Sequence, residues 1–484
     1  MLPDDVLLEI FDFCVYQDFD GVYSEKEIVE KWIGLAHVCR RWRSVVLQSP
    51  HRLNLRLVCT LNTPARETLD IWPPLPLIIR DFGIPSRPVT SAGVDNTIAV
   101  VEHNDRVCQI ELINFTSSRL GQFTDSAAMQ KPFPELTGLR LAVYKDDRPG
   151  SILPDSFLGG ITPRLRSFDL RGVPFPGLWK LLLSATHLVD LDLDYIPRSG
   201  YITPEAMATT LSALTSLEYL RLAFRYPRPR PALESRRPPP PPLTRSILPS
   251  LTVIRFKGAS EYLEVILARI DAPQIEDLSI TFFNQIIFDT PQLFQFIRRR
   301  PTLRALEKGR IAFLSKAIIF DFRSQTSFHD VLSVHMRCAV PEWQLSSLEQ
   351  VCTSSLPPIS TLEDLYILEN RGDEDPRWQD DFEDTLWLDL LRSFVALKNL
   401  YLSKEFVPRI APALQALVGG STTEVLPTLE NIFLEGFQPS GPLLKGIEKF
   451  VAARQLTSHP VAVSRWEGYS KRELPQEPGN IYDW

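Results

Sequence analysis

The sequence predicts an α/β protein in which a helical unit of about fifty residues precedes an irregular array of strand-and-helix repeats. Two observations lead to this prediction. Near the start, in residues 2–14 and 28–46, apolar residues recur every three or four positions, as on one face of a helix. Further on, a phrase of the form Leu-x-x-Leu-x-Leu returns between Val107 and Leu429, with helix signals between its copies. Strands that alternate with helices pair in parallel, so we expect a curved, mostly parallel sheet with the helices on its convex side.

The first predicted helix begins at Leu2-Pro3, and Asp4 and Asp5 in its first turn suit the positive end of the helix dipole. A second helix is expected over residues 24–46, opened by a capping box and stopped before Pro50. A helical unit this small rarely holds a core alone, so it is expected to need a neighbour. The first helix has one broad apolar face, made of Val6, Leu7, Ile10, Phe11 and Cys14.

These segments contain a distinctive order of residues: Leu2-Pro3, Asp4-Asp5, Ile10-Phe11, and then Val38-Cys39-Arg40-Arg41-Trp42-Arg43. This order resembles an F-box. The resemblance implies that the unit docks on the Skp-type adaptor, and through it on the cullin scaffold, of a cullin-RING ubiquitin ligase. The segment between Phe11 and Val38 exceeds the compact motif by roughly a dozen residues, a length that loops tolerate. The resemblance also implies which residues contact the adaptor or support that contact: Leu2, Pro3, Val6, Leu7, Ile10, Val38 and Trp42.

The repeated phrase has ten copies, and within two runs of copies the starts lie 23 to 35 residues apart. The last two apolar positions of each copy alternate with outward residues, which predicts a short strand. A unit of one strand and one helix buries its apolar face only by stacking on its neighbours. The copies begin at Val107, Leu136, Leu165, Leu188, Leu217, Leu251, Ile275, Leu362, Leu397 and Leu429.

This part of the chain resembles leucine-rich-repeat F-box proteins, particularly the divergent fungal kind. Six regions are expected: an F-box domain at 1–50, capping strands and a first repeat at 51–115, leucine-rich repeats at 116–302, an irregular β-rich insertion at 303–360, further leucine-rich repeats at 361–453, and a C-terminal strand and tail at 454–484. In the insertion, two β-rich runs predict either a hairpin or lengthened strands, followed by a helix near residues 346–352.

Two further segments have open interpretations. The run around Pro238–Pro242 should be extended polyproline II, which SH3 or WW grooves bind, although a solvated loop is the preferred interpretation. The basic triplet Arg298-Arg299-Arg300 ends a predicted helix. There a favourable interaction with the helix dipole is preferred over a phosphate site.

Composition excludes several classes of function. A hydrophobic fraction of 44% and a charged fraction of 23% are typical of a soluble folded chain, and a net charge of −7 argues against nucleic-acid binding. No apolar run approaches the length of a membrane span, and Met1 leads into acidic residues, so we expect a cytoplasmic or nuclear protein without a membrane partner. The six cysteines form no Cys-x-x-Cys pair, and no catalytic motif occurs, so we expect no metal, no cofactor and no enzymatic activity.

The resemblance and the repeats together predict a substrate-recognition subunit. Its F-box would bind the adaptor, and outward strand residues would hold a protein client for ubiquitination by a separate enzyme. The alternative is a non-degradative repeat scaffold that uses the F-box only for assembly. The expected client-facing residues are Arg140, Asp169, Asp190, Asp192, Tyr219, Arg221, Arg255, Tyr366, Tyr401 and Phe433.

Overall fold

The protein is described here by a computed structural model that divides into two compact units, Met1–Arg221 and Leu222–Trp484. The structure describes residues 2–16, 31–50, 52–81, 89–143, 152–226, 245–283, 290–304, 306–324, 331–338, 342–354, 356–369, 384–417, 425–436, 444–457 and 459–468. The polyproline run, the capping box before the second helix and the C-terminal tail lie outside these residues.

Among the residues that the structure describes, the first unit opens with three helices, α1 (Asp4–Tyr16), α3 (Lys31–Val38) and α4 (Arg40–Gln48). The helical period expected over residues 24–46 is divided between α3 and α4, because the helix is interrupted at Cys39. The backbone there is extended, with φ −159° and ψ 170°, and its thiol sulfur accepts a hydrogen bond from the Trp42 amide at 3.4 Å. Cys39 therefore caps a new helix instead of continuing the old one.

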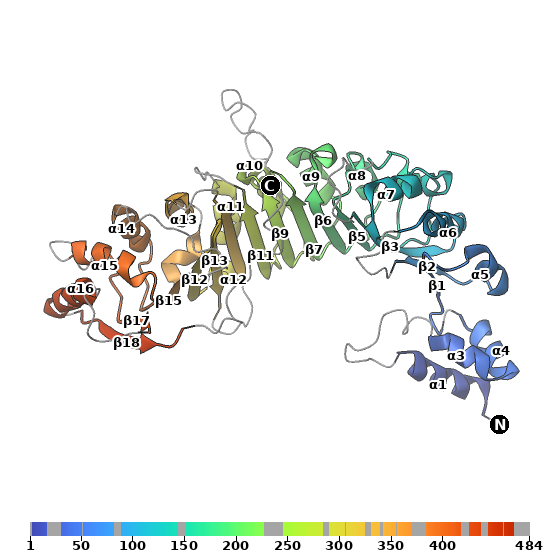
Figure 1. The fold of residues 1–484 in the computed structure, drawn as a ribbon, viewed down its shortest axis with the longest axis horizontal. Coiled ribbons are helices and arrows are strands. Elements are labelled where there is room, and N and C mark those ends of the chain that lie inside the picture. The colour runs from blue at the N-terminus through green and yellow to red at the C-terminus, as the bar shows by residue number, and fades with distance from the viewer. Residues whose placement is uncertain are drawn as a thin grey trace. The chain divides into compact units, whose positions relative to one another are not determined.

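Strands and helices then alternate through the rest of the first unit. The strands are β1 (Leu57–Cys59), β2 (Leu77–Arg80), β3 (Val107–Phe115), β4 (Gly138–Val143), β5 (Ser167–Arg171), β6 (Asp190–Ile196) and β7 (Tyr219–Phe224), the last of which contains the division between the units. They follow chain order in the sheet, and the ladders from β1 to β6 are parallel. The helices are α5 (Ala65–Ile71), α6 (Ser91–Val101), α7 (Ser117–Thr124), α8 (Leu178–Leu182) and α9 (Pro204–Leu211), with 3₁₀ turns η1 (Ala127–Gln130), η2 (Phe157–Gly160) and η3 (Arg198–Gly200). Helices α6 to α9 lie along one side of these strands (Figure 1).

The repeated phrase explains why each strand forms where it does. In the copy that begins at Leu136, the three leucines Leu136, Leu139 and Leu141 are at most 2% exposed. Leu139 is in register with Phe168 of β5 and Leu141 with Leu170, so equivalent positions of successive copies stack. Each such side chain contributes roughly 1.5 to 3 kcal/mol by burial. The apolar positions of the phrase thus form the core between the sheet and the helices.

The second unit carries the remaining repeats. Its strands are β8 (Ser246–Ile247), β9 (Val253–Gly258), β10 (Ile270–Asp271), β11 (Asp277–Phe282), β12 (Lys308–Phe313), β13 (Ala317–Arg323), β14 (Leu332–Arg337), β15 (Asp364–Glu369), β16 (Asn399–Leu402), β17 (Asn431–Glu435) and β18 (Ala462–Trp466). Its helices are α10 (Ser260–Arg269), α11 (Pro291–Arg298), α12 (Pro301–Arg304), α13 (Glu342–Ser354), α14 (Asp384–Arg392), α15 (Val407–Ala416) and α16 (Leu444–Leu456), with the 3₁₀ turn η4 (Pro357–Thr361). All ten copies of the phrase supply a strand.

The predicted β-rich insertion is a three-stranded antiparallel meander. Strand β12 pairs with β13, and β13 pairs with β14, both antiparallel. The outer strands face the repeats: β14 is parallel to β11, and β12 is parallel to β15. The strand order is therefore β9-β11-β14-β13-β12-β15-β16-β17-β18. The first of the two β-rich runs itself divides into β12 and β13, so the segment has three strands where a hairpin or two lengthened strands were expected. The helix expected after it is confirmed as α13.

Candidate functional site

The three N-terminal helices pack against one another through part of their apolar surface. Leu7 is 4% exposed and Phe11 is fully buried, with the Phe11 ring 4.8 Å from that of the half-buried Trp42. Arg41 closes the same bundle, with its Nη2 2.7 Å and its Nε 3.1 Å from Asp4 Oδ1. The single broad apolar face expected for α1 therefore divides, because Leu7 and Phe11 turn inward.

Five other apolar residues in or beside these helices are exposed, and we call them the exposed apolar stripe. It consists of Leu2 (52% exposed), Val6 (39%), Ile10 (41%), Phe13 (66%) and Val38 (60%). Four of the expected adaptor-facing residues lie on it. The expected Pro3 is also exposed, while Leu7 lies in the bundle and Trp42 supports it. Phe13 was missed, although its position three residues after Ile10 was the available signal.

The helices also contact the first repeat. Trp32 on α3 donates from its indole Nε1 to the Arg56 carbonyl at 3.0 Å, and its ring lies 5.3 Å from that of Trp72 after α5. Arg52 and Glu9 form an ion pair between the two parts. Removing the helical part would therefore expose apolar surface on the repeats.

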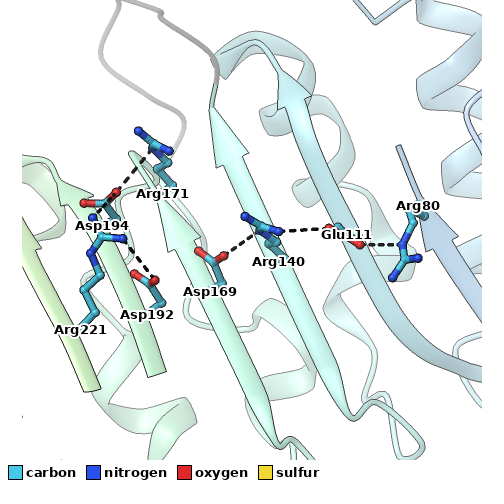
Figure 2. Close-up of polar contacts among 8 residues, drawn as sticks. All are labelled: Arg80, Glu111, Arg140, Asp169, Arg171, Asp192, Asp194 and Arg221. Atoms are coloured by element: carbon cyan, nitrogen blue, oxygen red, sulfur yellow. Dashed lines mark hydrogen bonds and ion pairs between the residues drawn. The ribbon is translucent and has the colours of Figure 1, made fainter. Parts of the chain in front are cut away.

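The outward residues of the first unit form a charged row, which comprises Arg80, Glu111, Arg140, Asp169, Asp192 and Arg221 (Figure 2). The first five are register partners on β2 to β6, so the strand pairing itself aligns them. Glu111 joins Arg80 at 2.6 Å and Arg140 at 3.3 Å, and Arg140 reaches Asp169 at 2.8 Å. Alternating signs on adjacent strands stabilise the row, because opposite charges meet across each ladder.

The alternation fails between β5 and β6, where Asp169 and Asp192 are direct register partners. Arg221 compensates from β7, 3.6 Å from Asp192 and 3.1 Å from Asp194, and Arg171 lies 3.6 Å from Asp194. Burial raises the pKa of Asp192 to about 6; Asp169 and Asp194 also raise it, and Arg221 opposes the shift. Burial likewise raises the pKa of Asp169, although Arg140 opposes it. At this end of the row, ionisation of Asp169 and Asp192 is therefore less favourable than ionisation of a carboxyl group in water.

Replacement of Asp192 by asparagine should change the pH dependence of the free energy of unfolding, because asparagine cannot carry the unfavourable charge. The pKa of Asp192 is higher in the folded state than its ordinary value of 3.8, so its protonated form favours folding. This contribution is present in full below about pH 4 and is lost as the pH rises through 6. We expect Asp192→Asn to raise the free energy of unfolding by roughly 2 kcal/mol at pH 8 and to have little effect near pH 4.

Urea unfolding at several pH values measures this difference. A difference between variant and wild type that stays constant with pH, or a loss of stability at pH 8, would contradict the assignment.

The second unit has an aromatic row made of Tyr366, Tyr401 and Phe433, which are register partners on β15, β16 and β17. Their rings stack with centroids 4.1 Å and 4.4 Å apart and planes inclined by 14° and 8°. Trp466 on β18 lies against this stack, 5.6 Å from Tyr401 and 5.9 Å from Tyr366. All four side chains are half-buried, so they offer a rigid, partly exposed edge at little cost in conformational entropy.

A polar ladder runs beside the aromatic row. Asn399 donates to Asp364 at 2.7 Å and accepts from Asn431 at 2.8 Å, again across register partners. Among the other expected residues, Arg255 on β9 lies 3.3 Å from Asp277, and Tyr219 on β7 is half-buried two residues before Arg221. Strand register thus brings most of the expected client-facing residues into two rows, one in each unit.

The described residues offer little to a catalytic interpretation. Ser333 Oγ lies 2.9 Å from His335 Nε2, as a nucleophile and its base would, but the hydroxyl donates its proton to Asp321, which pairs with Arg310. The pair therefore belongs to a polar network. Burial raises the pKa of the Cys338 thiol to about 11, which opposes formation of a nucleophilic thiolate. Across the ranges that the structure covers, no group of three or more His, Cys, Asp or Glu residues is placed to hold a metal ion.

No described helix combines the length and the apolar character needed to cross a membrane.

The fold is an α/β repeat array, in which a recurring leucine phrase supplies strands of a mostly parallel sheet. No family model matches the chain, and no curated protein matches it. Among solved structures, it is similar to the leucine-rich repeat-containing protein LegL7 from Legionella pneumophila. The two are 14% identical, and the match covers 81% of this chain and 97% of LegL7 with a TM-score of 0.26. A likeness at that score supports no argument, so the functional assignment rests on the residues of this chain.

Proposed function

We propose that the protein is the substrate-recognition subunit of a cullin-RING ubiquitin ligase, with α1 and α3 docking on the Skp-type adaptor. The observation that carries the proposal is the exposed apolar stripe. Val6, Ile10 and Val38 match adaptor-facing positions of the F-box and are exposed, while Leu7 and Phe11 pack inside the bundle. Covering such side chains is worth roughly 1.5 to 3 kcal/mol each when burial is complete, which favours a foreign subunit on this face.

Two client-contact surfaces are proposed, the charged row of the first unit and the aromatic row of the second, and each is considered by itself. Two properties support this role. Side chains fixed by strand register and by ion pairs lose little freedom on binding, and tyrosine, tryptophan and arginine are the residues that dominate binding energy at interfaces. The exposed part of Arg140, 53% of its side chain, and the edges of Tyr366 and Tyr401 are the expected contact points.

In this mechanism the chain is a non-catalytic subunit. It holds the client beside a separate ubiquitin-transferring enzyme, and the increase in effective concentration accelerates transfer to client lysines. Every step derived from this chain is therefore binding and orientation.

Purification of the full-length protein from its own cells should yield the Skp-type adaptor, and depletion of the protein should raise the level of at least one co-purifying client. The physical reason is that a client which loses its recognition subunit is no longer held near the transferring enzyme. Quantitative proteomics with and without depletion measures both results. Full-length protein is required, because Trp32 packs on Trp72 and truncation before residue 51 would disturb the repeats.

The same measurement separates the alternative, a non-degradative repeat scaffold. A scaffold would co-purify with the adaptor and its partners, but partner levels would stay constant on depletion. Absence of the adaptor from the purified complex would reject both versions of the assembly.

A further inference from the structure

Three arginines lie near one another in the second unit, and two of them contact one carboxylate. Arg299 and Arg300 directly follow α11, Arg245 directly precedes β8, and the carboxylate belongs to Asp271 at the end of β10. Strands β8 and β10 pair in parallel, which brings Arg245 close to Asp271 from a distant part of the chain. We call these four residues the arginine cluster.

The two helix-end arginines share the same oxygen atom. Arg300 Nη2 contacts Asp271 Oδ1, and Arg299 Nε lies 3.9 Å from that oxygen, beyond hydrogen-bonding distance. Arg245 instead donates from its Nη2 to Gln292 Oε1 at 3.3 Å. Asp271 therefore pairs with two guanidinium groups while Arg245 bonds a neutral amide, so the three arginines carry more positive charge than Asp271 balances.

Several donors of the arginine cluster are buried without an acceptor among the described residues. They are Nε of Arg245, Nε and Nη2 of Arg299, and Nε of Arg300. The Arg300 side chain is only 8% exposed, with its guanidinium 5.4 Å from the Phe296 ring centre. Buried charged donors are normally satisfied, because leaving them without a partner is costly. An acceptor beyond the described residues would satisfy these donors.

The repulsion among the three arginines also favours an additional anion. Burial lowers the pKa of Arg299, the nearby charges of Arg245 and Arg300 lower it further, and Asp271 opposes them. Attraction to the dipole at the end of α11, the interpretation preferred from sequence, does not explain why Arg245 joins the group. A second anion would relieve the repulsion.

We propose that Arg245, Arg299 and Arg300 bind an anion of the phosphate class. A phosphate dianion supplies two negative charges against the excess of the arginine cluster, and its several oxygens match the fork of guanidinium donors. The site is separate from the exposed apolar stripe, and the proposal does not depend on adaptor binding.

Calorimetric titration of the full-length protein with inorganic phosphate, at constant ionic strength, tests the proposal. We expect saturable binding that Arg299→Gln and Arg245→Gln each weaken at least about tenfold. The matched control is Arg298→Gln, which removes the same charge from the exposed neighbouring position and should change the affinity less than about twofold. Absence of saturable binding, or equal loss in the Arg298 and Arg299 variants, would overturn the proposal.

Thermal unfolding gives a second readout that a purely structural role would not produce. Without phosphate, Arg299→Gln should be at least as stable as wild type, because it removes a buried cation beside two others. Added phosphate should raise the unfolding temperature of wild type and of Arg298→Gln but not of Arg299→Gln, which reverses the ranking. A destabilised Arg299→Gln variant with an unchanged phosphate response would contradict the assignment.

Titration with O-phosphoserine separates the two sources of a phosphate group. Binding as tight as that of inorganic phosphate assigns the site to a phosphoryl group on a larger molecule. Binding of inorganic phosphate with exclusion of O-phosphoserine assigns it to the free ion.

Discussion

The double substitution Val6→Asp with Ile10→Asp should abolish capture of the Skp-type adaptor. Both side chains lie on the exposed apolar stripe, at 39% and 41% exposure. Because about 40% of each side chain remains exposed, covering both on docking is worth roughly 1 to 2.5 kcal/mol, and the substitution also places two carboxylates in an apolar interface. Affinity should therefore fall by at least about 100-fold, which pull-down and titration with the purified adaptor measure directly.

The fold of the repeats should survive this change, because exposed substitutions usually alter stability by no more than about 0.5 kcal/mol. The matched control is Leu183→Asp, at the end of α8, where the leucine is also 41% exposed. The control should capture the adaptor normally. Normal capture by the double variant would show that the stripe has another role.

Replacement of Asp321 by alanine should destabilise the second unit by about 3 to 5 kcal/mol, the cost of leaving a buried cation without its carboxylate. Asp321 on β13 is 3% exposed and accepts from Arg310 on β12, through Nε at 3.2 Å and Nη2 at 2.5 Å. Ser333 on β14 donates to the same carboxylate. One carboxylate therefore ties together the three strands of the meander.

The double variant Arg310→Met with Asp321→Leu provides the control. An apolar pair of similar volume needs no desolvated charge, so it should restore most of the lost stability. The loss of stability is measured by urea unfolding, with hydrogen exchange of the β12 to β14 amides as the probe. A single variant that loses less than about 1 kcal/mol, or a double variant as unstable as the single one, would exclude a structural role for the ion pair.

The sequence alone predicts those strands and helices that depend on the spacing of nearby side chains. All ten copies of the repeated phrase became strands, and α9 and α11, two of the helices between the copies, begin at Pro204 and Pro291. Thr203 caps its helix by accepting from the Ala206 amide. These features follow from side-chain spacing and from the missing amide of proline, which act over a few residues.

Features that depend on distant pairing were not predictable in the same way. The spacing in α1 does not say which apolar residues turn inward, because that depends on the positions of Trp42 and α3. The proximity of Arg245 to Arg299 depends on the β8–β10 pair, whose two-residue strands leave no periodic signal. The rows on the sheet were predicted as sets of outward residues, but their order of contacts comes from strand register.

The meander also limits how this array can vary. Its antiparallel strand β13 is flanked by β12 and β14, whose directions match the repeats on either side. Loss of β13 together with β14 would leave β12 between β11 and β15 with every strand pointing the same way. Loss of β13 alone would leave β12 and β14 as parallel neighbours, and parallel neighbours need a crossover connection of a dozen or more residues instead of a tight turn. Where the strands are joined by tight turns, they can therefore be added or removed at this position only in pairs, because only an even change keeps the strand directions of the flanking repeats.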